Sequence, residues 1–156
     1  MKVIKPPTEL PIKDLRLKIF LAGSIEMGVA EDWQKKLEKK LSKFDVIIYN
    51  PRRDDWDSTW KQSIDEPKFV EQVNWELDAL DDADLILLYL QPDTKSPISL
   101  LELGLHAAHK NLIVCCPEGF WRKGNVDIVS DRYKLQAVDT LDELIDAVVE
   151  RCERDL

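Results

Sequence analysis

Glu102 is the carboxylate best placed to do chemistry, because it lies among leucines in the segment Ser96-Pro-Ile-Ser-Leu-Leu-Glu-Leu-Gly104. Two interpretations of this segment remain open. In the first, Ser99 caps a helix and Glu102 completes the capping box by reaching back to the serine N–H. In the second, Ser96 is the N-cap and Pro97 is the first helical residue. Glu102 then lies one turn deeper on a helix that is apolar nearly all round, which predicts a buried carboxylate and a candidate nucleophile.

A second candidate carboxylate, Glu76, belongs to a segment with helical periodicity. At about 100° per residue, positions 69, 73, 76, 77 and 80 share one stripe, whereas Asp78 points away from it. Glu76 is therefore expected to face the core. Two interpretations are about equally supported: an ion pair with Arg52 or Arg53, and a catalytic acid.

The bulk composition limits the possible partners and the compartment. The chain has 156 residues, which is the size of one domain spanning residues 1–156, and 22 basic against 30 acidic residues give a net charge of −8. The basic residues are scattered, which argues against nucleic acid as a partner. The longest apolar run, residues 85–90, is far shorter than the roughly 20 residues of a membrane span. Three cysteines, two of them adjacent, fit a reducing compartment, so we expect a cytoplasmic protein without a membrane partner.

Apolar runs alternate along the chain with segments of helical periodicity. The pattern predicts strands at 17–22, 46–49, 85–90 and 112–116, and helices at 30–41, 68–80, 97–109 and 141–152. Residues 117–140 are expected to be irregular, and residues 1–14, with three prolines, to form an extended arm. Alternation of this kind is typical of βαβ units, so we predict an α/β fold with a doubly wound parallel sheet in a single domain.

The segments that leave the predicted strands are polar or rich in glycine. They are Gly23-Ser24, Asn50-Pro-Arg-Arg53, residues 91–96 and residues 117–125. In a doubly wound sheet, ligands bind outside the carboxyl ends of the strands, at a topological switch point. We therefore expect these segments to converge at one edge of the sheet.

Neither a cofactor nor a metal ion is predicted. The sequence contains neither G-x-G-x-x-G nor G-x-x-x-x-G-K-[ST], so neither a nicotinamide dinucleotide nor ATP is supported. His106 and His109 have a spacing that a metal site could use, but no third ligand stands at a suitable distance in the sequence.

Several segments together resemble the nucleoside 2-deoxyribosyltransferase family. They are Phe20-Leu-Ala-Gly-Ser24, Glu76-Leu-Asp-Ala-Leu-Asp-Asp-Ala-Asp84, and residues 96–104 followed by His106-Ala-Ala. The resemblance runs from about Lys18 to Cys116. Residues 50–60 and 120–125 resemble, more narrowly, a deoxyribosyltransferase-like branch of that family.

The resemblance implies a fold, a reaction and a set of partners. The fold would be flavodoxin-like or Rossmann-like, assembled as a homodimer or a higher homo-oligomer. Glu102 would attack C1′ of a 2′-deoxyribonucleoside to form a deoxyribosyl ester, and Glu76 would act on the leaving base. A nucleoside or nucleotide and a free nucleobase would be the small-molecule partners. The implied substrate-binding residues are Gly23, Ser24, Phe20, Asn50, Arg52, Arg53, Trp56, Ser96, Trp121 and Asn125.

Three departures from the family pattern leave the reaction open. Phe20 replaces a tyrosine that orients the nucleophile, and Ser96 replaces an aspartate that binds a sugar hydroxyl. The serines at positions 24 and 96 resemble those of a family branch that hydrolyses nucleoside 5′-monophosphates. However, Glu26 stands where that branch has an arginine. Arg52 and Arg53 could take over that role. The alternatives to a transferase are a nucleotide N-glycosidase and a nucleoside-binding module without chemistry.

Overall fold

Six parallel strands form a single sheet in the described part of the chain, which comprises residues 1–11, 13–25 and 32–155 of the computed structural model. The strands are β1 (Lys2–Ile4), β2 (Lys18–Gly23), β3 (Ile47–Tyr49), β4 (Leu85–Tyr89), β5 (Leu112–Cys115) and β6 (Gln136–Val138). Their order across the sheet is β1-β3-β2-β4-β5-β6, and every neighbouring pair is parallel. Glu26 lies outside the described residues.

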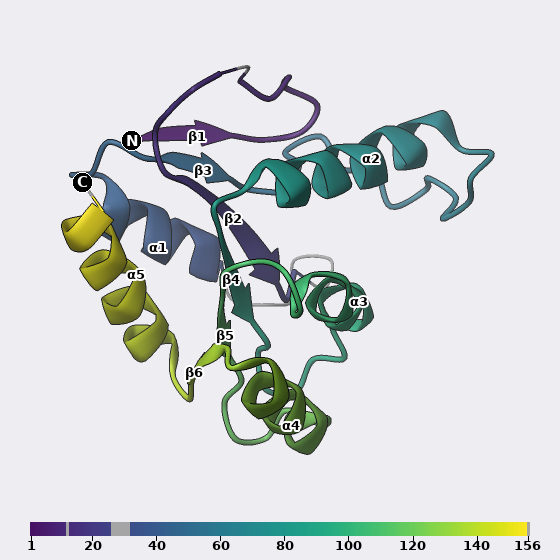
Figure 1. Ribbon diagram of the computed structural model, residues 1–156. Helices are drawn as coiled ribbons and strands as arrows, with labels where there is room; N and C mark the ends of the chain where they lie inside the picture. The colour runs from purple at the N-terminus through teal and green to yellow at the C-terminus, as the bar shows by residue number, and fades with distance from the viewer. Residues whose placement is uncertain (12, 26–31, 156) are drawn as a thin grey trace.

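Helices cover both faces of the sheet (Figure 1). On one face lie α1 (Trp33–Leu41) and α5 (Leu141–Asp155), and on the other lie α2 (Pro67–Asp82), α3 (Pro97–His106) and α4 (Lys123–Tyr133). Alternate residues of β2 face the two layers: Ile19 and Leu21 pack with α1 and α5, whereas Phe20 and Ala22 pack with α2 and α3. The predicted doubly wound α/β fold is confirmed.

The switch point of the sheet lies between β2 and β4. These two central strands are neighbours, from Ile19 paired with Leu85 to Gly23 paired with Tyr89. From β2 the chain continues outward to β3, whereas from β4 it continues outward on the other side to β5 and β6. The strand order without β1 is the flavodoxin-like order, and a crevice is expected where the connections diverge.

Three elements were not predicted from the sequence. The N-terminal segment contributes the edge strand β1, which pairs with β3 from Lys2↔Ile47 to Ile4↔Tyr49. The stretch 117–140, expected to be irregular, contains helix α4 and strand β6. Their apolar pattern is weak because α4 includes Gly124 and buries little of its surface, and β6 has only three residues.

Helix α3 also differs from the expectation of burial all round. Ile98, Leu101 and Leu105 are 58%, 57% and 46% exposed, and they lie along one side of the helix. The buried residues of the helix are Ser99, Glu102, Leu103 and His106, and Leu103 packs into the core on this face of the sheet. No helix in the described residues combines the length and the apolarity that crossing a membrane would need.

Candidate active site

Helix α3 begins at Pro97 and therefore places Glu102 in its second turn. Ser96 is the N-cap, with a left-handed φ of 44°, and Pro97 is the first helical residue. The second interpretation of the segment is therefore the one observed, and Glu102 lies inside the helix. Its side chain is buried, at 9% exposure. Burial, followed by the negative charge of Glu76, raises the pKa of Glu102 to about 8.

Helix α2 brings Glu76 close enough for its charge to act on Glu102. Both helices pack against β2, which explains how residues far apart in the sequence come together. Burial raises the pKa of Glu76, although a hydrogen bond from Gln72 Nε2 to Glu76 Oε1 of 2.7 Å opposes this rise. The same Gln72 nitrogen donates to the Pro51 carbonyl at 3.0 Å, which holds the amide in place. Among the described residues Glu76 forms no ion pair, so the predicted pairing with Arg52 or Arg53 is not observed.

Three hydroxyl groups meet at the start of α3. Ser24 Oγ lies 2.6 Å from Ser96 Oγ and 2.9 Å from Thr94 Oγ1, and the latter two oxygens are 2.9 Å apart. All three residues are buried, and the backbone N–H of Gln91 donates to Ser24 Oγ at 3.0 Å. This cluster joins the ends of β2 and β4 at the switch point, where the sequence predicted Ser24 and Ser96. Thr94 and Gln72 were not predicted.

Gly23 permits the close approach of β2 and β4 at this point. Its φ is 140°, and a Cβ atom there would lie 2.3 Å from the carbonyl oxygen of Tyr89. No side chain fits in that space, so the glycine is required for the backbone path that leads to Ser24. Gly23 thus shapes the site through its backbone.

The guanidinium group of Arg52 retains hydrogen-bond donors that a ligand could use. Its Nη1 lies 3.5 Å from a carboxylate oxygen of Asp32, whereas its buried Nε and Nη2 have no hydrogen-bond partner in the described part of the chain. Asn50 is buried and orders the turn, because its Oδ1 accepts the Arg52 N–H at 2.9 Å and its Nδ2 donates to Glu38 at 2.7 Å. Asp32 directly precedes Trp33, whose indole donates to the Ser24 carbonyl at 3.1 Å.

Arg53, also predicted to bind substrate, is engaged within the protein. Its side chain is 1% exposed and pairs with Asp55 at 2.6 Å and with Glu71 at 2.9 Å. The guanidinium also lies over the ring of Trp60, 5.0 Å from its centroid. Trp56, which is 38% exposed, packs edge-on against the same tryptophan. Arg53 and Trp56 thus both contact Trp60 in the loop after β3.

The remaining predicted residues occupy two different settings. Phe20 is fully buried in the core between the sheet and α2 and α3, so its ring supplies packing and no hydrogen bond. Trp121 is 48% exposed, and its indole donates to the Lys95 carbonyl at 3.0 Å, which ties the loop after β5 to the loop before α3. Asn125 is exposed on α4.

In the described residues no group of three or more potential ligands could hold a metal ion.

A family model described as "Nucleoside 2-deoxyribosyltransferase like" matches residues 16–120. The chain belongs to this family. The match contains Glu76, Glu102 and the hydroxyl cluster, and it ends before Trp121 and Asn125. Membership makes nucleoside-type small molecules the expected class of substrate.

A solved structure supports the fold. The crystal structure of a conserved protein from Enterococcus faecalis V583 is similar to this chain with a TM-score of 0.58 and 14% sequence identity. The similarity covers 87% of this chain and 99% of that protein. At this identity the likeness concerns the fold alone. No curated protein matches the sequence significantly.

Proposed function

We propose that this member of the deoxyribosyltransferase-like family cleaves the N-glycosidic bond of 2′-deoxyribonucleosides and transfers the deoxyribosyl group to another nucleobase or to water. The observation that carries the proposal is the pair Glu76 and Glu102. Both carboxyl groups have raised pKa values, and the charge of one acts on the other. Two coupled carboxyl groups that share a proton supply one acid and one nucleophile at neutral pH.

The proposed reaction has two steps. In the first, Glu102 Oε attacks C1′, the N-glycosidic bond breaks with its electron pair moving to the base, and Glu76 gives its proton to the departing nitrogen. The product is a deoxyribosyl ester on Glu102. In the second, a nitrogen of the acceptor base or a water molecule attacks C1′, Glu76 removes its proton and Glu102 is released. This retaining chemistry requires the two carboxyl groups to lie about 5 to 5.5 Å apart.

In the ligand-free protein the proton is on Glu102, so it has to move before the first step can occur. Glu102, with a pKa of about 8, carries a proton at neutral pH, yet the nucleophile must be ionised. The hydrogen bond from Gln72 favours the ionised form of Glu76. The proton therefore has to move from Glu102 to Glu76 when substrate binds. A sugar hydroxyl that donates to Glu102 would drive this exchange, because a donor stabilises the charged form.

The decisive experiment is incubation with deoxynucleosides in the presence and absence of a free base, with chromatographic detection of released and exchanged bases. We expect Glu102→Gln to abolish turnover and Glu76→Gln to lower it about 100- to 10,000-fold. Asp78→Asn, an exposed carboxylate of the same helix α2, is the matched control and should react normally. Unchanged base release by Glu102→Gln would refute the proposal. A deoxynucleoside that binds and stays intact would identify a binding module.

A 2′-deoxynucleoside 5′-monophosphate N-glycosidase is the second candidate function. It is favoured by the two buried Arg52 nitrogens that have no partner in the described residues. Arg52 also pairs with Asp32, whose neighbour Trp33 donates to the Ser24 carbonyl. A phosphate has the acceptor oxygens that a guanidinium and hydroxyl groups bind. A 5′-phosphate that accelerates cleavage in the wild type and no longer does so in Arg52→Ala would establish this variant. Arg132→Ala, an exposed arginine of α4, is the control.

We also propose that the chain forms a homo-oligomer through α3. The exposed residues Ile98, Leu101 and Leu105 form an apolar stripe on the helix that carries Glu102. Such stripes on a small protein commonly mark interaction sites. A second copy covering this stripe would bring its own exposed side chains close to the candidate active site.

A further inference from the structure

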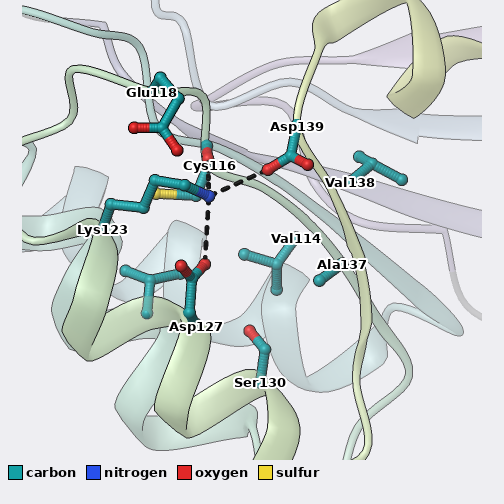
Figure 2. Close-up of a pocket in the computed structure, with 10 residues that line it drawn as sticks. Val114, Cys116, Glu118, Lys123, Asp127, Ser130, Ala137, Val138 and Asp139 are labelled. Carbon is teal, nitrogen blue, oxygen red and sulfur yellow. Dashed lines mark hydrogen bonds and ion pairs between the residues drawn. The ribbon is translucent and has the colours of Figure 1, made fainter.

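A cavity of about 340 Å³ lies between α4 and the carboxyl ends of β5 and β6 (Figure 2). This volume is in the range of small-molecule sites, roughly 300 to 1,000 Å³. None of its lining residues belongs to the candidate active site. Its apolar lining comes from Val114 of β5, Val126 of α4, and Ala137 and Val138 of β6. The cavity therefore offers an apolar surface for the body of a small ligand.

The rim of the cavity is acidic. It carries Glu118, Asp127, Asp139 and Lys123. Lys123 Nζ donates to the Cys116 carbonyl at 3.0 Å, to Asp127 at 3.3 Å and to Asp139 at 2.9 Å, as Figure 2 shows. An ammonium group has three hydrogens, so these acceptors use all of them. Three carboxylates and one ammonium leave the rim with two net negative charges, which favours a cation over an anion.

Ser130 adds an unused hydrogen-bonding group inside the cavity. The residue is 3% exposed, and its hydroxyl has no hydrogen-bond partner among the described residues. Figure 2 shows this hydroxyl pointing from α4 toward the cavity. Buried hydroxyl groups in native proteins nearly always have a partner, so one aimed into a cavity points to a ligand. Ser130 follows Asp127 by three residues, which places it about 4.5 Å further along the helix.

We propose that this cavity binds a small amino alcohol. The ammonium group lies at the rim against the carboxylates of Asp127 and Asp139, the carbon chain covers the apolar lining, and the hydroxyl pairs with Ser130. We take a chain of about four carbons, because Asp127 and Ser130 are separated by a helical rise of about 4.5 Å. A metal ion is a poorer occupant, because the described residues contain no group of three potential ligands that could hold one.

The test uses four probes with four carbon atoms each, and their binding is followed by backbone amide NMR shifts. They are 4-aminobutan-1-ol, butan-1-amine without the hydroxyl, butane-1,4-diol without the charge, and 4-hydroxybutyrate with the opposite charge. We expect saturable shifts around the cavity with the amino alcohol and about fivefold weaker binding of the amine, the size of one hydrogen bond. The diol and the acid should give no saturable shifts.

Variants separate a built site from general attraction to an acidic surface. Ser130→Ala should remove the preference for the amino alcohol over the amine, and Asp139→Asn should weaken both cations about tenfold. Asp131 is an exposed carboxylate of α4, the helix that carries Ser130, and pairs with Lys134. Asp131→Asn should change neither the preference for the amino alcohol nor the affinity for the two cations. The amide spectrum away from the cavity reports whether each variant is folded. Absence of saturable binding, equal binding of 4-hydroxybutyrate, or an unchanged preference in Ser130→Ala would overturn the proposal.

Discussion

Replacing Glu102 by glutamine is expected to stabilise the fold, and increasingly so at higher pH. The pKa of Glu102 is raised from 4.5 to about 8 in the folded state, because the carboxyl group is buried and lies near the charge of Glu76. In the range between these values the folded state holds a proton that the unfolded state has lost. The contribution of Glu102 to stability is therefore greatest below pH 4.5 and decreases as pH rises toward 8.

The magnitude follows from the same two values. Each pH unit above 4.5 costs the wild type about 1.4 kcal/mol, which amounts to about 3 kcal/mol at pH 7. Glutamine has nearly the same shape and no charge to lose, so the variant avoids this cost. The difference in unfolding free energy between variant and wild type should grow from less than about 1 kcal/mol at pH 5 to about 3 kcal/mol at pH 7.

Urea denaturation at a series of pH values and at one protein concentration measures this difference. Glu150→Gln, the same substitution on an exposed position of α5, is the matched control and should stay within about 0.5 kcal/mol of the wild type. A difference that does not vary with pH would refute the reasoning. A Glu102→Gln variant less stable by about 0.5 to 2 kcal/mol at every pH would show a helix-capping glutamate instead.

Three other predictions test the coupling between Glu76 and Glu102, the close approach of β2 and β4 at Gly23, and the exposed face of α3. First, kcat/KM should be bell-shaped in pH, because only the singly protonated pair reacts; its alkaline limb should lie near pH 8 and its acid limb above pH 4.5, and a flat profile across this range would contradict the coupling. Second, Gly23→Ala should lower the unfolding free energy by about 2 to 4 kcal/mol, since its Cβ would lie 2.3 Å from the Tyr89 carbonyl oxygen; a variant with wild-type thermal stability would disprove the close approach. Third, Leu101→Lys should shift the chain to monomer in analytical ultracentrifugation with an unchanged circular dichroism spectrum, whereas the exposed α4 variant Ile128→Lys should not; equal masses for wild type and Leu101→Lys would argue against an interface at α3.

The parts of the fold that the sequence predicted are those with strong apolar patterns. Strand β4 has five consecutive buried residues, from Leu85 to Tyr89, and a run of this kind is typical of a central parallel strand. Strand β6 has no comparable signal, because its residues 136–138 are mostly exposed and it pairs only at the edge of the sheet. Helix α4 was missed for a related reason: Ile128, one of its few large apolar residues, is 72% exposed.

The candidate site was only partly predictable, because pairing between distant segments depends on the tertiary fold. Ser24 and Ser96 stood out as polar residues after strands, and residues 91–96 were expected to approach Ser24. The sequence did not single out Thr94 as the residue that would bond to Ser24 across a separation of 70 residues. Gln72 did leave a signal, since it precedes Glu76 by four residues and such pairs meet on a helix. Arg53 looked equivalent to Arg52, and only the fold shows that Asp55 and Glu71 engage it.

The central claim is that Glu102 becomes covalently bonded to the sugar. Mass spectrometry of the protein quenched in acid during turnover of a 2′-deoxynucleoside tests it most directly, with fragmentation used to locate any modification. The account predicts one deoxyribosyl group on the peptide that contains Glu102, and none when Glu102→Gln is treated in the same way. A modification on a different residue, or base release without any modified peptide in a rapid-quench series, would contradict it.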